Sequence, residues 1–120
     1  MVEREPAVDP SAIDRLLEMT GGDVAFLDEL VDTYFEDAPL QLRAMREAAE
    51  AGAVGDLVRP AHSLKTNSAN MGAEVLAGLC RALEAEARSG TVEDAIGRVA
   101  ATEAEFAAVR TALLALRTSR

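Results

Sequence analysis

The stretch AHSLKTNSANMG, residues 61–72, has the spacing of an amphipathic helix that ends at Gly72. At about 100° per residue, the small and apolar side chains that fall within about 40° of Leu57 define a core face: Ala61, Leu64, Ser68 and Met71. His62 lies near ~140° and Lys65 near ~80° from Leu57. The imidazole is therefore predicted to point outward, with the lysine ammonium beside it.

Residues 1–22 predict an extended lead followed by a short helix. Residues 1–8 have no periodicity and form an extended lead, after which Asp9 and Pro10 are typical of a helix start. A short apolar stripe follows and ends at Gly21 and Gly22. Residues 1–8 are therefore a lead, and the domain begins at residue 9.

The next segment is long and contains a proline. Asp23 can cap it, and apolar residues recur at helical spacing from Phe26 to Ala49. Pro39 lies inside this pattern, where it lacks an amide donor and clashes with the preceding turn. We expect either a kink or two abutting helices around residues 37–40.

Two more amphipathic segments follow residue 72 and complete the domain. The first ends at Gly90, and the second begins near Thr91, which with Asp94 resembles a capping box. Short connections between long amphipathic helices favour antiparallel neighbours. The fold class is therefore predicted to be all-α: an antiparallel, up-down four-helix bundle with a short additional N-terminal helix, in one domain over residues 9–120.

The composition disfavours several classes of function. The net charge is −9, whereas binding to nucleic acid or to an anionic membrane requires a basic surface. Cys80 is the one cysteine, which excludes an intramolecular disulfide and a cysteine-based zinc cluster. No stretch approaches the roughly 18 apolar residues of a spanning helix or resembles a signal peptide. We expect a cytoplasmic protein without nucleic-acid or membrane partners.

His62 and Lys65 together predict phosphoryl chemistry. An exposed histidine usually needs no functional explanation, but here a cation follows one helical turn later, and the residues within the next two turns, Ser68 and Ala69, are small. Neutral imidazole has a nucleophilic ring nitrogen at physiological pH. The compact ammonium of Lys65 can neutralise part of the charge of a phosphoryl group that arrives and leaves.

Other chemistries fit this stretch less well. A metal site would need further ligands at helical spacing, and His62 has no acidic residue three or four positions later. Ser63 and Ser68 point away from His62, which disfavours a serine nucleophile. Neither GxxxxGK[ST] nor GxGxxG occurs, so we expect no ATP site and no metal site. The phosphate must then come from another protein.

These residues resemble the histidine-containing phosphotransfer (HPt) domain family, whose signature is roughly A-H-x-L-K-G-x-[SA]-x-x-x-G. The matching positions are Ala61, His62, Leu64, Lys65, Ser68 and Gly72. GGDVAFLDELVDTYFEDAP, residues 21–39, resembles the second helix of the family, and LCRALEAEARSG, residues 79–90, resembles the pattern after the motif.

The resemblance implies that the protein is a phosphoryl carrier and not an autokinase. His62 would accept a phosphoryl group from an aspartyl phosphate on a response-regulator receiver domain and pass it to a second receiver, and Lys65 would stabilise the phosphohistidine. The receiver of a hybrid histidine kinase is one candidate donor. This chain would bind no cofactor, and Mg²⁺ is expected on the receiver partner.

Thr66 departs from the family, which usually has glycine at this position. It lies four residues after His62 and is a direct neighbour of the imidazole on the helix surface. Its hydroxyl could bond to the His62 carbonyl or to the phosphoryl group, or its bulk could change which receiver fits. We assign these residues to partner docking: Val58, Arg59, Thr66, Ala69 and Gly72.

The sequence also permits an alternative function and an alternative oligomeric state. The alternative function is a helical adaptor that binds receivers or kinases without accepting phosphate, and Thr66 is the feature that favours it. A closed four-helix core favours a monomer, although Tyr34 and Phe35 could supply a surface for a dimer.

Overall fold

The computed structural model describes residues 5–119, and within this range the chain is helical and contains no strand. The elements are α1 (Pro10–Met19), α2 (Val24–Glu50), the 3₁₀ turn η1 (Val54–Leu57), α3 (Val58–Asn70), α4 (Glu74–Arg88) and α5 (Ala95–Thr118). None of these helices is long and apolar enough to cross a membrane.

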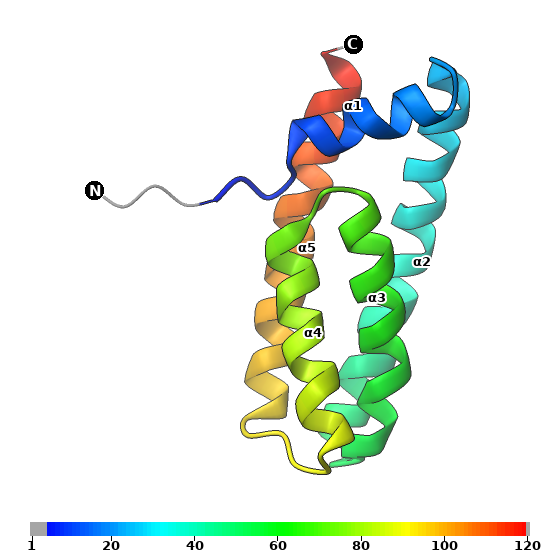
Figure 1. Cartoon of the computed structure of the whole chain (residues 1–120). Helices are drawn as coiled ribbons and strands as arrows, with labels where there is room; N and C mark the ends of the chain where they lie inside the picture. Colours follow the sequence, from blue (N-terminus) through cyan, green and yellow to red (C-terminus); the bar gives the residue numbers. More distant parts are fainter. Residues whose placement is uncertain (1–4, 120) are drawn as a thin grey trace.

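Helices α2 to α5 form an up-down bundle in which the chain reverses direction at each connection (Figure 1). α3 packs between α2 and α4, and α5 packs against α4 and α2. The short α1 lies across the end of the bundle where α2 begins (Figure 1). The predicted all-α bundle with a short extra N-terminal helix is confirmed.

Local sequence signals explain where the first two helices begin. The Asp9 carboxylate accepts a hydrogen bond from the Ser11 amide, and Pro10 occupies the first helical position. The Asp23 carboxylate accepts from the Phe26 amide in the same way. Of the predicted extended lead, residues 1–4 lie outside the described residues, and Val8 is already buried in the core. Packing therefore begins just before the first cap.

Pro39 does not divide the second segment, because α2 is one continuous helix from Val24 to Glu50. The prediction of two abutting helices is wrong. Proline removes only one amide donor, and two nearby residues of the same helix, Ala38 just before it and Leu42 three positions after it, are buried against the rest of the bundle. Tertiary packing thus keeps the helix intact through the proline.

The last helix begins later than the sequence predicts. Asp94, and not Thr91, is the N-cap of α5, and its carboxylate accepts a hydrogen bond from the Gly97 amide. Asp94 adopts a left-handed conformation with φ of 50°, which aspartate tolerates better than most residues. The capping-box prediction placed the start of this helix in the right segment, but it named Thr91 as the cap in place of Asp94.

Tyr34 and Phe35 belong to the interior of the bundle. Tyr34 is only 3% exposed, its hydroxyl lies 2.8 Å from Ser68 Oγ, and burial raises its pKa. Phe35 is partly buried against the core, and the guanidinium of Arg110 lies over its ring. Neither residue supplies the exposed apolar surface that a dimer through this segment would need.

Candidate functional site

α3 presents His62 to solvent because the opposite face of the helix is fully buried. Leu57, Ala61, Leu64 and Ser68 have no exposed surface, whereas 55% of the His62 side chain is exposed. Pro60 is tolerated near the start of α3, since the first amides of a helix have no partner within it. The outward direction of the imidazole agrees with the helical spacing of the sequence.

Glu84 on α4 connects the charged groups of the site. His62 Nδ1 lies 2.9 Å from Glu84 Oε2, and Lys65 Nζ donates to Glu84 Oε1 at 2.6 Å. Arg88, one turn further along α4, donates to Glu84 Oε2 at 2.8 Å. We call Glu84, His62, Lys65 and Arg88 the Glu84 cluster. Its carboxylate is only 7% exposed and contacts all three basic side chains.

The cluster keeps Glu84 ionised. Hydrogen bonds from Lys65 and then Arg88 outweigh the effect of burial and lower the pKa of Glu84 to about 2. An ionised carboxylate can only accept hydrogen bonds, so Nδ1 of His62 must carry the hydrogen. In the neutral ring the other nitrogen, Nε2, then has a free lone pair. Glu84 thus favours the tautomer in which Nε2 carries the free lone pair.

The sequence did not reveal the partner of Lys65. The sequence places the ammonium beside the imidazole but gives it no partner, whereas in the structure it donates to Glu84 and is 24% exposed. Glu84 and Arg88 were missed because they lie on another helix, 22 and 26 positions after His62. The one local signal was the spacing of four between Glu84 and Arg88, which predicts a pair on one helix face.

Four of the five predicted docking residues lie on or beside the outward face of α3. Arg59 and Thr66 are exposed, and Val58 and Ala69 are partly buried. Apart from Arg59, the side chains around His62 on this face, Val58, Thr66 and Ala69, are small or medium-sized. A protein surface could approach the imidazole closely here.

Gly72 does not belong to this surface, and its assignment to docking is corrected. It is buried, has φ of +75°, and a Cβ at this position would lie 2.6 Å from Ala12 Cβ and 2.9 Å from the Asp9 carbonyl oxygen. Its own carbonyl accepts a hydrogen bond from the Asp9 amide at 2.9 Å. Gly72 therefore ends α3 and allows the start of α1 to pack on that end.

Within residues 5–119, Thr66 makes none of the side-chain-to-backbone hydrogen bonds that threonine often makes in a helix. Thr33, Thr102, Thr111 and Thr118 each donate to the carbonyl four residues earlier. Among the hydrogen bonds of the described residues, no such bond joins Thr66 to the His62 carbonyl. The exposed Thr66 side chain instead forms part of the surface beside the imidazole.

Comparison with known proteins agrees with this arrangement. The family model described as Hpt domain matches residues 29–118. The crystal structure of histidine-containing phosphotransfer protein B from Pseudomonas aeruginosa PAO1 is similar, with a TM-score of 0.85 and 34% sequence identity. The similarity covers 98% of this chain and 99% of that one. No curated protein sequence gives a significant match.

Proposed function

The chain belongs to the Hpt domain family, and from this premise we propose that it carries phosphoryl groups between receiver domains through His62. The observation that supports the proposal most directly is the contact between His62 Nδ1 and the buried carboxylate of Glu84. This contact leaves Nε2 free on an exposed helix face. A carrier needs these two properties, a fixed nucleophilic nitrogen and room for a protein partner.

The proposed step requires no proton transfer by this chain. The Nε2 lone pair attacks the phosphorus of an aspartyl phosphate, an N–P bond forms, and the P–O bond to the aspartate breaks with its electron pair returning to that carboxylate. Nδ1 keeps its hydrogen, so the phosphorylated ring is positively charged. Glu84 faces that charge at 2.9 Å and stabilises it. Transfer to the next aspartate reverses these bond changes and restores the neutral ring.

Lys65 and Arg88 set the charge balance of the site. They bring two permanent positive charges against the single negative charge of Glu84. The excess positive charge can attract the phosphoryl oxygens, because opposite charges a few ångströms apart interact favourably near a protein surface. We assign Lys65 to stabilising the phosphohistidine and Glu84 to orienting the imidazole. The receiver supplies Mg²⁺ and most of the transfer machinery.

The second candidate is an adaptor that binds receivers without accepting phosphate. The observation that favours it is Thr66, whose exposed side chain stands where the family usually has glycine. A partner that fits over glycine meets additional atoms here. We favour a functional carrier with altered partner fit, because the nucleophile and its orienting carboxylate are both in place.

The test is phosphotransfer from purified phosphorylated receivers to the wild-type protein and to His62→Gln. The wild type should acquire an acid-labile, alkali-stable label, and His62→Gln should acquire none. Lys65→Ala should retain labelling but transfer about tenfold more slowly, because it removes one charge contact and leaves the nucleophile. Thr66→Gly in the same assay shows which receivers the threonine disfavours.

Stable labelling of His62→Gln would contradict the proposal. A loss in Lys65→Ala as complete as that in His62→Gln would contradict the roles assigned to the two residues. Receiver binding by the wild type and by His62→Ala, without labelling of either, would instead support the adaptor.

A further inference from the structure

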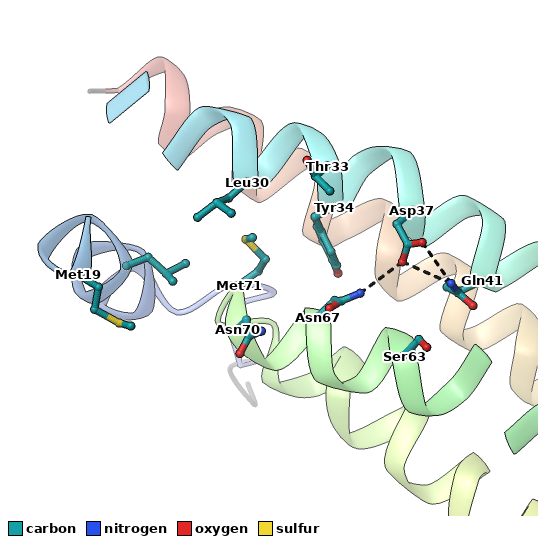
Figure 2. Close-up of a pocket in the computed structure, with 11 residues that line it drawn as sticks. Met19, Leu30, Thr33, Tyr34, Asp37, Gln41, Ser63, Asn67, Asn70 and Met71 are labelled. Atoms are coloured by element: carbon teal, nitrogen blue, oxygen red, sulfur yellow. Dashed lines mark hydrogen bonds between the residues drawn. The ribbon is translucent and has the colours of Figure 1, made fainter. Parts of the chain in front are cut away.

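A groove of about 620 Å³ lies between α1, α2 and α3, next to the outward face of α3. Its two ends differ in polarity (Figure 2). The end beside α1 is lined by Leu16, Met19, Leu30 and Met71, and Met19 is 82% exposed. The other end is lined by polar side chains, which are Asp37, Gln41, Ser63 and Asn67.

Among residues 5–119, Asp37 is the one charged side chain that lines this groove. Figure 2 shows its carboxylate between two side-chain amides: Gln41 Nε2 donates at 3.2 Å and Asn67 Nδ2 at 3.3 Å. These donors come from α2 and α3 and orient the half-buried carboxylate. No cation contacts Asp37 among the residues that the structure describes.

Other carboxylates that bridge helices have arginine partners. Arg46 contacts Glu103, Arg98 contacts Glu86, and Arg117 contacts Asp28 and Asp32. Asp37 thus differs from them in having neutral partners only. Since an ionised carboxylate accepts up to about four hydrogen bonds, it retains acceptor capacity toward the groove. A carboxylate that is partly removed from water and has no internal cation is a favourable contact for a cation of a partner.

The groove is continuous with the surface on which the proposed transfer takes place. Ser63 follows His62 directly in the chain, and Asn67 follows Thr66. Thr66 lies four residues after His62 and three after Ser63, so its side chain is a surface neighbour of both on α3. A receiver that covers His62 and Thr66 therefore also reaches Ser63 at the polar end of the groove. The apolar end, with the flexible and exposed Met19, can adapt to an apolar side chain of the same partner.

The geometry points to Asp37 as a specificity-determining residue: it selects receivers that place a lysine or arginine over the polar end of the groove when they dock on His62. This inference rests on the proposed function, because the receiver is the occupant. Asp37 would change the affinity for the receiver and not the rate of the chemical step, since it does not contact the Glu84 cluster. Receivers that lack a basic side chain at this place would be poor partners.

The experiment measures kcat and KM for transfer from a panel of purified phosphorylated receivers to wild-type protein, Asp37→Asn and Asp37→Lys. The matched control is Glu36→Gln, which removes a negative charge from the preceding, exposed residue that does not line the groove. Labelling of His62 by phosphoramidate, a phosphodonor that needs no receiver, shows whether the site is intact in each variant.

With the preferred receivers, Asp37→Asn should raise KM about tenfold with kcat nearly unchanged, and Asp37→Lys should raise it further. Salt should weaken transfer to the wild type more than to Asp37→Asn. Glu36→Gln should resemble the wild type, and phosphoramidate should label all variants equally.

Equal KM values for the wild type and Asp37→Asn with every receiver that labels the wild type would overturn the inference, while leaving the carrier function intact. A KM increase in Glu36→Gln as large as that in Asp37→Asn would also overturn it, because the effect would then be one of net charge. Failure of every receiver to label the wild type would overturn the carrier function and this inference together.

Discussion

Two carboxylates from neighbouring helices lie on opposite sides of α3, one with charged partners and one with neutral partners. On the α4 side, Glu84 is almost completely buried and contacts Lys65, Arg88 and the imidazole. On the α2 side, Asp37 is half-buried and contacts two neutral amides. Within the described part of the chain, cations compensate the negative charge of Glu84 but not that of Asp37.

Under the proposed function, this difference would give the carboxylates on the two sides of α3 two separate tasks. A carboxylate that is surrounded by internal cations stays ionised and keeps its neighbours in place, which suits the orientation of a nucleophile. A carboxylate that is oriented by amides keeps its charge available to a partner. The comparison predicts that changes on the α4 side alter the rate of the chemical step, and that changes on the α2 side alter receiver affinity.

The largest effect on transfer, after loss of the histidine itself, is expected for Glu84→Ala. This change removes the acceptor of the Nδ1 hydrogen and leaves Lys65 and Arg88 without their shared carboxylate. A hydrogen bond to a charged group contributes about 1.5–3 kcal/mol, so kcat should fall about 10- to 100-fold with a smaller change in KM. Nitrogen NMR of the imidazole should show a mixture of tautomers in place of the single Nδ1–H form.

Glu86→Ala is the matched control for this prediction. Glu86 lies on the same helix and also pairs with an arginine, Arg98, but it does not contact His62. It should retain the wild-type tautomer and nearly the wild-type kcat. A single Nδ1–H tautomer in Glu84→Ala would show that Glu84 does not select it.

A smaller effect on transfer is expected for Gly72→Ala, and it should appear in KM and not in kcat. A side chain at Gly72 would meet Asp9 and Ala12 and displace α1, whose later residues Leu16 and Met19 line the groove. Left-handed strain and crowding together should lower the free energy of unfolding by about 3 kcal/mol. At a temperature where the variant is folded, KM for receivers should rise severalfold while the His62 tautomer stays unchanged.

Gly52→Ala separates strain from crowding in this experiment. Gly52 also has a positive φ, +68°, but a Cβ there would meet no atom within 4 Å. The free energy of unfolding of Gly52→Ala should fall by only about 1 kcal/mol, which is the cost of the left-handed conformation. Equal losses in Gly52→Ala and Gly72→Ala, measured by urea unfolding, would mean that the contact with α1 contributes nothing.

Much of the fold was predictable because its signals are local. The caps at Asp9 and Asp23, the end of α3 at Gly72 and the outward direction of His62 depend on a few neighbouring residues. The continuity of α2 through Pro39 was not predictable, because it depends on packing by distant parts of the chain. For the same reason, the sequence indicated that Gly72 ends a helix but not that α1 covers it.

The candidate site was only half predictable from the sequence. His62 and Lys65 share one helix, so their spacing alone placed them together. Glu84 depends on the register between α3 and α4, and the pairing of Asp37 with Asn67 depends on the register between α2 and α3. Periodicity identifies the buried face of each helix, but it does not specify which residues meet across two helices.

The smallest expected effect is a pH dependence of stability that comes from Glu84. The pKa of its carboxyl is about 2 in the folded protein, against an ordinary value of 4.5. Above pH 4.5 the carboxylate is ionised in both states, and its favourable contacts contribute fully to stability. As the pH falls from 4.5 toward 2, the unfolded chain binds a proton that the folded chain does not, so this contribution is lost. The melting-temperature difference between the wild type and Glu84→Gln, measured by circular dichroism, should therefore be largest near neutral pH and shrink below pH 4.5. A difference that stays constant down to pH 3 would show that the cations around Glu84 do not stabilise its ionised form.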